Sequence, residues 1–231
     1  MNKGMLIVLE GLDSSGKATQ TKLLEEKLKE KGIKTKTYSF PRYNEFFGKL
    51  IAEYLKGKFG KKEDVPEEFV SLLYSLDRYE IKKEINSFLE KGFVVLMDRY
   101  YTSNFAYQTA KFSKEKKRKD FLGWLKKLES AMPFPDMVFF LDVPVEFSQK
   151  LMDSRKQKDY MKEKKDIHEK DLDYQKKVRE MFLELCRTEK NWFIVECTEK
   201  GKLKTKEKIN DFLWSKIELL LNQENKKASL A

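Results

Sequence analysis

Cysteine and histidine are scarce in this sequence. Its 231 residues include two cysteines, Cys186 and Cys197, and a single histidine, His168. The sequence has no C-x-x-C pair and no histidine cluster, which argues against a structural zinc site and against a disulfide framework. We therefore expect a protein of a reducing compartment, with a cytoplasmic location.

Long apolar runs are also missing. No stretch approaches the roughly 20 apolar residues that a membrane-spanning helix needs, and the chain opens on a strand-like run rather than a signal peptide. We expect no membrane partner. Hydrophobic residues still make up 40% of the sequence, enough for the core of one domain. The predicted domain spans residues 1–221, with a charged, mobile lid at about 155–170, and a frayed tail follows at 222–231.

The charge is unbalanced, with 48 Lys and Arg against 38 Asp and Glu, a net charge of +10. A basic chain can bind nucleic acid. Here lysine alternates with glutamate, as in residues 25–31, a pattern typical of a solvated helix surface. We therefore predict no nucleic-acid partner, and we expect the excess positive charge to attract polyanionic nucleotides.

Short apolar segments alternate with helical patterns along the chain. The five expected strands are residues 5–9, 33–40, 93–97, 137–141 and 192–195. Helices are expected at 19–31, 46–55, from 66 towards 89, and at 103–111, 121–130, 145–155, 172–188 and 204–221. This alternation predicts an α/β fold: a five-stranded parallel sheet with helices on both faces.

Polar side chains follow the first three expected strands. Asp13 comes after the first, Arg42 after the second, and Asp98 and Arg99 after the third. Ligands of parallel sheets bind beyond the carboxyl ends of the strands. We therefore expect these four side chains to converge at one site.

The segment between the first strand and the first helix has the spacing of a phosphate-binding loop. Gly11 and the pair Gly16-Lys17 match G-x-x-x-x-G-K. In such a loop, backbone N–H groups and the positive end of the following helix surround a polyphosphate. Lys17 adds a point charge for the outer phosphates, so the segment predicts a nucleotide site.

One position departs from this motif. The residue after the lysine is normally Ser or Thr, whose hydroxyl ligates Mg²⁺, and here it is Ala18. Thr19 follows, but on a helix it points about 100° away from Ala18. Substitution of Thr19 for the missing hydroxyl therefore cannot be assumed.

Taken together, these segments resemble the thymidylate kinase family of P-loop nucleoside monophosphate kinases, up to about residue 220. The motifs that carry the resemblance are residues 10–20, 40–42, 76–80 and 98–108. The resemblance implies a P-loop NTPase fold, a homodimer, and ATP-dependent phosphorylation of dTMP to dTDP for dTTP synthesis. It also implies Mg²⁺ as cofactor and ATP as phosphoryl donor.

The resemblance assigns ATP binding to the phosphate loop, with Lys17 on the β- and γ-phosphates. The residues assigned to ATP are Gly11, Leu12, Asp13, Ser14, Ser15, Gly16, Lys17, Ala18 and Thr19.

The resemblance also implies an acceptor site. Arg42 would grip the dTMP phosphate through paired donors. Arg78 would bond a thymine carbonyl, while Tyr74, one helical turn earlier, would stack on the ring. From the residues alone, Arg42 also fits an ordinary surface arginine, and Tyr74 fits core packing.

The remaining acceptor residues come from two motifs. Asp13 would accept a hydrogen bond from the deoxyribose 3′-hydroxyl. Ser103 and Gln108 would meet the base, and Tyr107 would crowd the 2′ position of the sugar and so favour deoxyribose.

For catalysis, the resemblance implies that Arg99 bridges the donor and acceptor phosphates and that Asp98 orients Mg²⁺-bound water. Some members carry a catalytic arginine in the phosphate loop, where this chain has serines. We therefore assign that charge to the lid residue Arg155, with Lys156 and Lys158 as substitutes. A solvated helix end is the competing interpretation of this stretch, and we assign no chemistry to His168.

Two further functions remain open. The chain could phosphorylate another deoxynucleotide or a deoxynucleoside, although an acceptor without a phosphate would not need Arg42. It could also bind nucleotides with weak or no catalysis because of Ala18.

Overall fold

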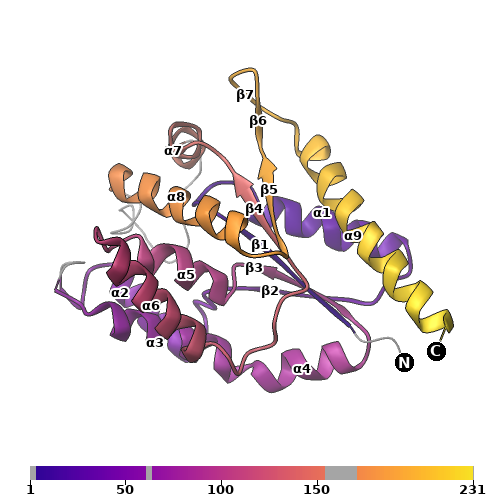
Figure 1. The fold of residues 1–231 in the computed structure, drawn as a ribbon, viewed down its shortest axis with the longest axis horizontal. Helices are drawn as coiled ribbons and strands as arrows, with labels where there is room; N and C mark the ends of the chain where they lie inside the picture. The colour runs from indigo at the N-terminus through magenta and orange to yellow at the C-terminus, as the bar shows by residue number, and fades with distance from the viewer. Residues whose placement is uncertain (1–3, 61–63, 154–170, 231) are drawn as a thin grey trace.

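The computed structural model describes residues 4–60, 64–153 and 171–230. At its centre lies a five-stranded parallel sheet with the strand order β2-β3-β1-β4-β5. Its strands are β1 (Met5–Gly11), β2 (Thr35–Ser39), β3 (Val94–Asp98), β4 (Met137–Asp142) and β5 (Trp192–Glu196). Helices cover both faces (Figure 1). The predicted α/β fold is therefore confirmed.

The helices of the described segments are α1 (Lys17–Glu30), α2 (Phe46–Leu55), α3 (Glu67–Glu80), α4 (Lys82–Glu90), α5 (Tyr101–Thr109), α6 (Glu115–Leu128), α7 (Val145–Asp153), α8 (Leu172–Thr188) and α9 (Lys206–Leu230). A short antiparallel hairpin of β6 (Thr198–Glu199) and β7 (Lys202–Leu203) follows β5. No helix in these segments is long and apolar enough to cross a membrane.

The central strand β1 is buried on both faces. Leu6 and Val8 pack into one core with α4, α5, α6 and α8, whereas Ile7 and Leu9 pack into a second core with α1 and α9. Figure 1 shows α1 and α9 together on one side of the sheet. A strand covered on both faces has a continuous apolar sequence, which explains the strong strand signal of residues 5–9.

The strand register brings the loops of the predicted site together. Leu9 and Ser39 are both paired with Asp98, and Gly11 is paired with Leu141. The carboxyl ends of β1, β2 and β3 therefore lie side by side. The phosphate loop, the segment after β2 and the segment after β3 all start from this edge.

Helices α2 and α3 pack against each other through a separate, smaller core. Its buried members are Ile51, Tyr54, Leu55, Val65, Val70 and Leu73. Tyr43 and Tyr74 pack against this cluster and connect it to the edge of the sheet where the loops meet.

Several element boundaries differ from the prediction. Helix α6 begins at Glu115 instead of the expected residue 121, so residues 115–119 of the basic segment form its first turns. Of this helix only Phe121 and Leu125 are buried, and an ion pair of 2.6 Å joins Glu115 to Lys119. The first turns thus lack the apolar spacing from which the helix was predicted.

The helix expected from residue 66 towards 89 is two helices. It is interrupted at Ile81, where φ is −106°, and neither Gly nor Pro marks that position. Helix α9 continues to Leu230, beyond the expected end at residue 221. The predicted lid at about 155–170 lies outside the described residues.

Candidate active site

The phosphate loop connects β1 to α1 and depends on two glycines. Gly11 has φ of 155°, and a Cβ at this position would lie 2.5 Å from Ser15 Oγ and 3.1 Å from the Leu141 carbonyl oxygen. Gly16 adopts φ of 92° as the residue that precedes α1. A side chain is disfavoured in this left-handed region, so both positions need glycine.

The N-terminus of α1 faces the loop without a side-chain cap. Gly16 makes no side-chain capping bond, and the first turn of α1 carries no acidic residue. The first N–H groups of a helix have no partner within the helix. Together with the positive end of the helix dipole, they form a ready-made anion site.

Lys17 is buried beneath the loop. Its Nζ donates hydrogen bonds to the carbonyl oxygens of Gly11 (3.1 Å) and Leu12 (2.8 Å). Burial is the main cause that lowers the pKa of Lys17, and the nearby Arg99 guanidinium lowers it further, to about 8. The ammonium is thus held in place by neutral carbonyls, and a phosphate beside it would restore its charged form.

Ala18 and Thr19 are both exposed on the first turn of α1, whereas Ser15 is buried within the loop. Ser15 Oγ has no hydrogen-bond partner in the described structure. Ser15 thus supplies a buried loop hydroxyl that no other group in the described structure uses.

Arg99 lies between the phosphate loop and the segment after β3. Its Nη2 donates to Asp13 Oδ1 (3.0 Å) and to the Tyr107 hydroxyl (3.2 Å), and its Nη1 donates to Ser103 Oγ (3.4 Å). The guanidinium also lies 5.2 Å from the centre of the Tyr107 ring. Arg99 thus connects four sequence-predicted residues, itself included, in one cluster.

The backbone of Arg99 is strained. Its φ is 66°, in the left-handed region that a bulky residue rarely occupies. Its N–H donates to the Leu9 carbonyl oxygen at 3.0 Å, which fixes the strained turn to the end of β1. Such strain persists only where surrounding contacts enforce it, and it occurs often at functional sites.

Glu10 supplies much of that enforcement, although the sequence motifs assigned no role to this residue. Its buried carboxylate accepts hydrogen bonds from Tyr100 N (3.1 Å), Thr102 Oγ1 (2.6 Å) and Ser103 Oγ (2.6 Å). Burial raises the pKa of Glu10, although the Arg99 charge and these donors oppose the increase. An acidic residue at the end of an otherwise apolar strand was the available signal.

A cavity opens beside Arg99 and between α3 and α5. It is lined by Asp13, Pro41, Tyr43, Leu55, Tyr74, Arg99, Ser103, Asn104, Tyr107 and Gln108. Six residues predicted to bind the acceptor are therefore at one cavity. Gln108 is buried and its Oε1 has no partner within the described residues. Tyr74 also packs against the α2–α3 core, so the two interpretations of Tyr74 are compatible.

Arg42 is held by acidic side chains at the rim. Its Nε donates to Asp77 Oδ1 (3.0 Å), its backbone N–H donates to Asp77 Oδ2 (2.9 Å), and its Nη2 pairs with Glu80. Burial raises the pKa of Asp77, while its contacts with Arg42 lower it. Arg42 is therefore oriented by α3 rather than lying loose on the surface.

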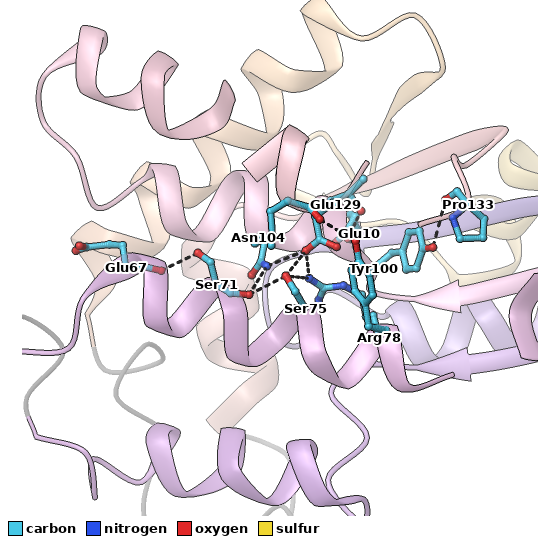
Figure 2. Close-up of polar contacts among 12 residues, drawn as sticks. Glu10, Glu67, Ser71, Ser75, Arg78, Tyr100, Asn104, Glu129 and Pro133 are labelled. Carbon is cyan, nitrogen blue, oxygen red and sulfur yellow. Dashed lines mark hydrogen bonds and ion pairs between the residues drawn. The ribbon is translucent and has the colours of Figure 1, made fainter. Parts of the chain in front are cut away.

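Arg78 does not line the cavity. Its guanidinium is buried, and Nη2 forms an ion pair with Glu129, the residue after α6 (Figure 2). The same nitrogen donates to Ser75 Oγ at 3.3 Å. Arg155, like Lys156, Lys158 and His168, lies outside the described residues, so its predicted role stays a prediction.

A family model of thymidylate kinase matches residues 9–209. The chain belongs to the thymidylate kinase family. A thymidylate kinase of Plasmodium falciparum is 34% identical over 225 residues, covering 92% of this chain and 97% of the relative. A probable thymidylate kinase of Pyrococcus abyssi is 38% identical over 195 residues, covering 84% of this chain and 88% of the relative.

Solved structures agree with the sequence comparison. The structure of thymidylate kinase from Candida albicans superposes with a TM-score of 0.77 at 30% identity, covering 97% of this chain and 94% of the solved one. The predicted family, fold and enzyme class are therefore confirmed. The comparisons favour dTMP phosphorylation over the alternatives left open by the sequence.

The sequence did not reveal the acidic residues that contact the arginines of the site. Glu10, Asp77 and Glu129 each contact an arginine or its backbone neighbour from a distant part of the chain. Asp77 and Arg78 lie within the motif at residues 76–80, but a motif does not reveal which partner an acidic side chain meets.

Proposed function

We propose that the chain phosphorylates dTMP to dTDP by in-line transfer of the γ-phosphoryl group of ATP. The observation that carries this proposal is the position of Arg99, whose guanidinium contacts both the phosphate loop at Asp13 and the acceptor cavity at Tyr107 and Ser103. Family membership supports ATP as donor and dTMP as acceptor.

On the donor side, the phosphate loop would bind the triphosphate. The N–H groups at the start of α1 surround its charge, and Lys17 turns from its loop carbonyls to the outer phosphates. Phosphoryl transfer needs positioning and charge neutralisation more than covalent chemistry. A fixed loop and a buried lysine supply both.

Between the substrates, Arg99 would reduce the repulsion of two anions that must approach each other. Its contacts with Asp13, Ser103 and Tyr107 hold the guanidinium before substrate arrives. A charge that is already in place needs no reorganisation during the reaction, so it stabilises the transition state efficiently.

On the acceptor side, Arg42 would bind the monophosphate. Asp77 and Glu80 occupy its Nε and Nη2 and so fix the plane of the guanidinium at the rim. The base would enter the cavity between Tyr74 and the buried amide of Gln108. Arg78, which does not line the cavity, would donate to the base through its unpartnered Nε.

The described residues offer Mg²⁺ few protein ligands, so the substrate phosphates and water would supply most of its coordination. The described residues contain no group of three acidic, His or Cys side chains suited to a metal ion. Asp98, at the end of β3, is close enough to Lys17 to raise its pKa and could bind Mg²⁺ through water. Mg²⁺ commonly keeps several waters and binds through few carboxylates and substrate phosphates. When bound, it would neutralise phosphate charge.

We also propose that the chain forms a homodimer in the cytoplasm. Phe69, Leu72 and Leu76 of α3 are exposed large hydrophobic side chains at helical spacing. An apolar stripe of this kind suits a second copy of α3. We expect the wild type to sediment as a dimer and the double variant Leu72→Glu, Leu76→Glu to sediment as a monomer. A double variant that still sediments as a dimer would contradict an interface on α3.

The experiment that tests the proposed function is a panel of acceptors. ADP release is measured with ATP and Mg²⁺ in the presence of dTMP, other deoxynucleoside monophosphates, or thymidine. We expect dTMP to give the highest kcat/KM and thymidine to give background rates, because Arg42 would have no phosphate to bind. Background release with every acceptor would instead favour a nucleotide-binding protein without catalysis.

A further inference from the structure

Glu129 is a buried carboxylate that does not belong to the phosphate loop. It follows the last residue of α6, and its side chain is 1% exposed. Figure 2 shows its carboxyl group in the middle of polar side chains from α3 and α5. Its Oε1 accepts hydrogen bonds from Ser75 Oγ (2.6 Å) and Asn104 Nδ2 (3.2 Å), and it forms the ion pair with Arg78.

The pair places two opposite charges away from water. The Arg78 side chain is only 2% exposed, so its charge needs a partner inside the protein. Asp77 also attracts Arg78 electrostatically, but Asp77 is bonded to Arg42. A buried ion pair contributes little net stability compared with apolar packing, whereas loss of one partner is costly. A role beyond stability would account for a pair at this position.

The contacts of Glu129 lead to the acceptor cavity. Asn104 lines that cavity, and its Nδ2 donates both to Glu129 and to the Ser71 carbonyl oxygen (3.2 Å). The ion pair with Arg78 uses Nη2, while the buried Nε of Arg78 has no partner in the described structure. Glu129 therefore orients Asn104, whose Nδ2 donates to Glu129 and Ser71, and Arg78, whose Nε donor stays without a partner in the described structure.

We propose that Glu129 is a positioning residue for recognition of the acceptor base. It holds the Arg78 guanidinium next to Asn104, a residue of the cavity wall, so that the unpartnered Nε donor of Arg78 is available to a carbonyl oxygen of the base. This inference rests on the proposed function, because it takes dTMP as the acceptor. A site built to donate to a substrate oxygen rejects an analogue that lacks this oxygen, since buried donors are then left without a partner.

The test compares two acceptors in wild type and in Glu129→Gln. One acceptor is dTMP, and the other is the analogue whose base lacks the carbonyl oxygen next to the methyl group. Glutamine keeps the size of the side chain but removes the charge that fixes Arg78. We expect kcat/KM for dTMP to fall about tenfold or more, mainly through KM, and kcat/KM for the analogue to change less than about threefold. The KM for ATP should stay the same.

Two further variants separate positioning from folding. Glu189→Gln is the matched control, because Glu189 also pairs with a residue near the end of α6, Lys126 (2.6 Å), but in a more exposed ion pair. This variant should leave the ratio of kcat/KM for the two acceptors unchanged. Ser75→Ala removes the 2.6 Å hydrogen bond to Glu129 and should give a smaller loss in the same direction. If Glu129→Gln does not fold, the ratio of kcat/KM for the two acceptors in Ser75→Ala tests the proposal instead.

Equal losses for both acceptors, or no loss for dTMP, would overturn the positioning role. Wild-type protein that does not phosphorylate dTMP at all would instead overturn the proposed function. The two failures are therefore distinguishable in one set of measurements.

Discussion

Lys17 titrates within the range of ordinary assay buffers, and ATP binding should depend on pH as a result. Burial and the neighbouring Arg99 charge lower the pKa of Lys17 to about 8. A phosphate chain next to Nζ favours the charged ammonium and raises that pKa. We predict that ATP binding at about pH 8 is accompanied by proton uptake.

The magnitude follows from the pKa. About half of the Lys17 side chains are protonated in the ligand-free protein at about pH 8. Full protonation in the complex then corresponds to uptake of about 0.5 proton per ATP, and affinity falls about tenfold between about pH 7 and about pH 9.

The lowered pKa of Lys17 also makes the stability of the folded protein depend on pH. The folded pKa, about 8, lies below the ordinary value of 10.5, so the unfolded chain binds more protons between these two values. The free energy of unfolding therefore rises with pH across this window, by about 3 kcal/mol if Lys17 acts alone.

Titration calorimetry measures the uptake directly. ATP is titrated at about pH 8 in two buffers with different protonation enthalpies, and the difference in heat gives the number of protons. Lys17→Arg keeps a positive charge that does not titrate in this range, so uptake should disappear while binding persists. Lys22→Arg, on the exposed side of α1, should keep the wild-type uptake. Heat that is independent of buffer in wild type, or equal uptake in Lys17→Arg, would refute the reasoning.

Three substitutions test other parts of the site. Arg99→Ala should lower kcat by about 10²–10³-fold at saturating substrates, because it removes a preorganised charge; unchanged turnover would exclude Arg99 from the mechanism. Ala18→Ser should keep or raise activity and lower the Mg²⁺ concentration needed for half-maximal rate, and a large loss would show that the loop requires the methyl group. Gly11→Ala should abolish ATP binding by calorimetry in protein that remains folded by circular dichroism, since its Cβ would meet Ser15 and the Leu141 carbonyl; retained affinity would contradict this account of the loop.

The fold was largely predictable because the three inner strands of the sheet, β3, β1 and β4, are buried on both faces. Residues 5–9 and 93–97 are continuous apolar runs, and the structure has strands there. Helix α8 was predicted with its observed ends, Leu172 and Thr188. The start of α6 was missed because its first turns are charged and exposed, so they show no apolar period.

The candidate site was predictable in its parts but not in its connections. Strand ends and a glycine spacing located Asp13, Arg99 and the phosphate loop. The partners of the arginines could not be found, because Arg42 meets a residue 35 positions away and Arg78 meets one 51 positions away. Such pairs depend on helix packing, which no local pattern encodes.

The central claim is that two nucleotides meet with their phosphates at Arg99. A crystal structure with dTMP and a non-hydrolysable ATP analogue measures this directly. We predict that the monophosphate contacts Arg42 and Arg99 and that the triphosphate follows the loop from Gly11 to Lys17. A monophosphate bound away from both arginines would contradict the account.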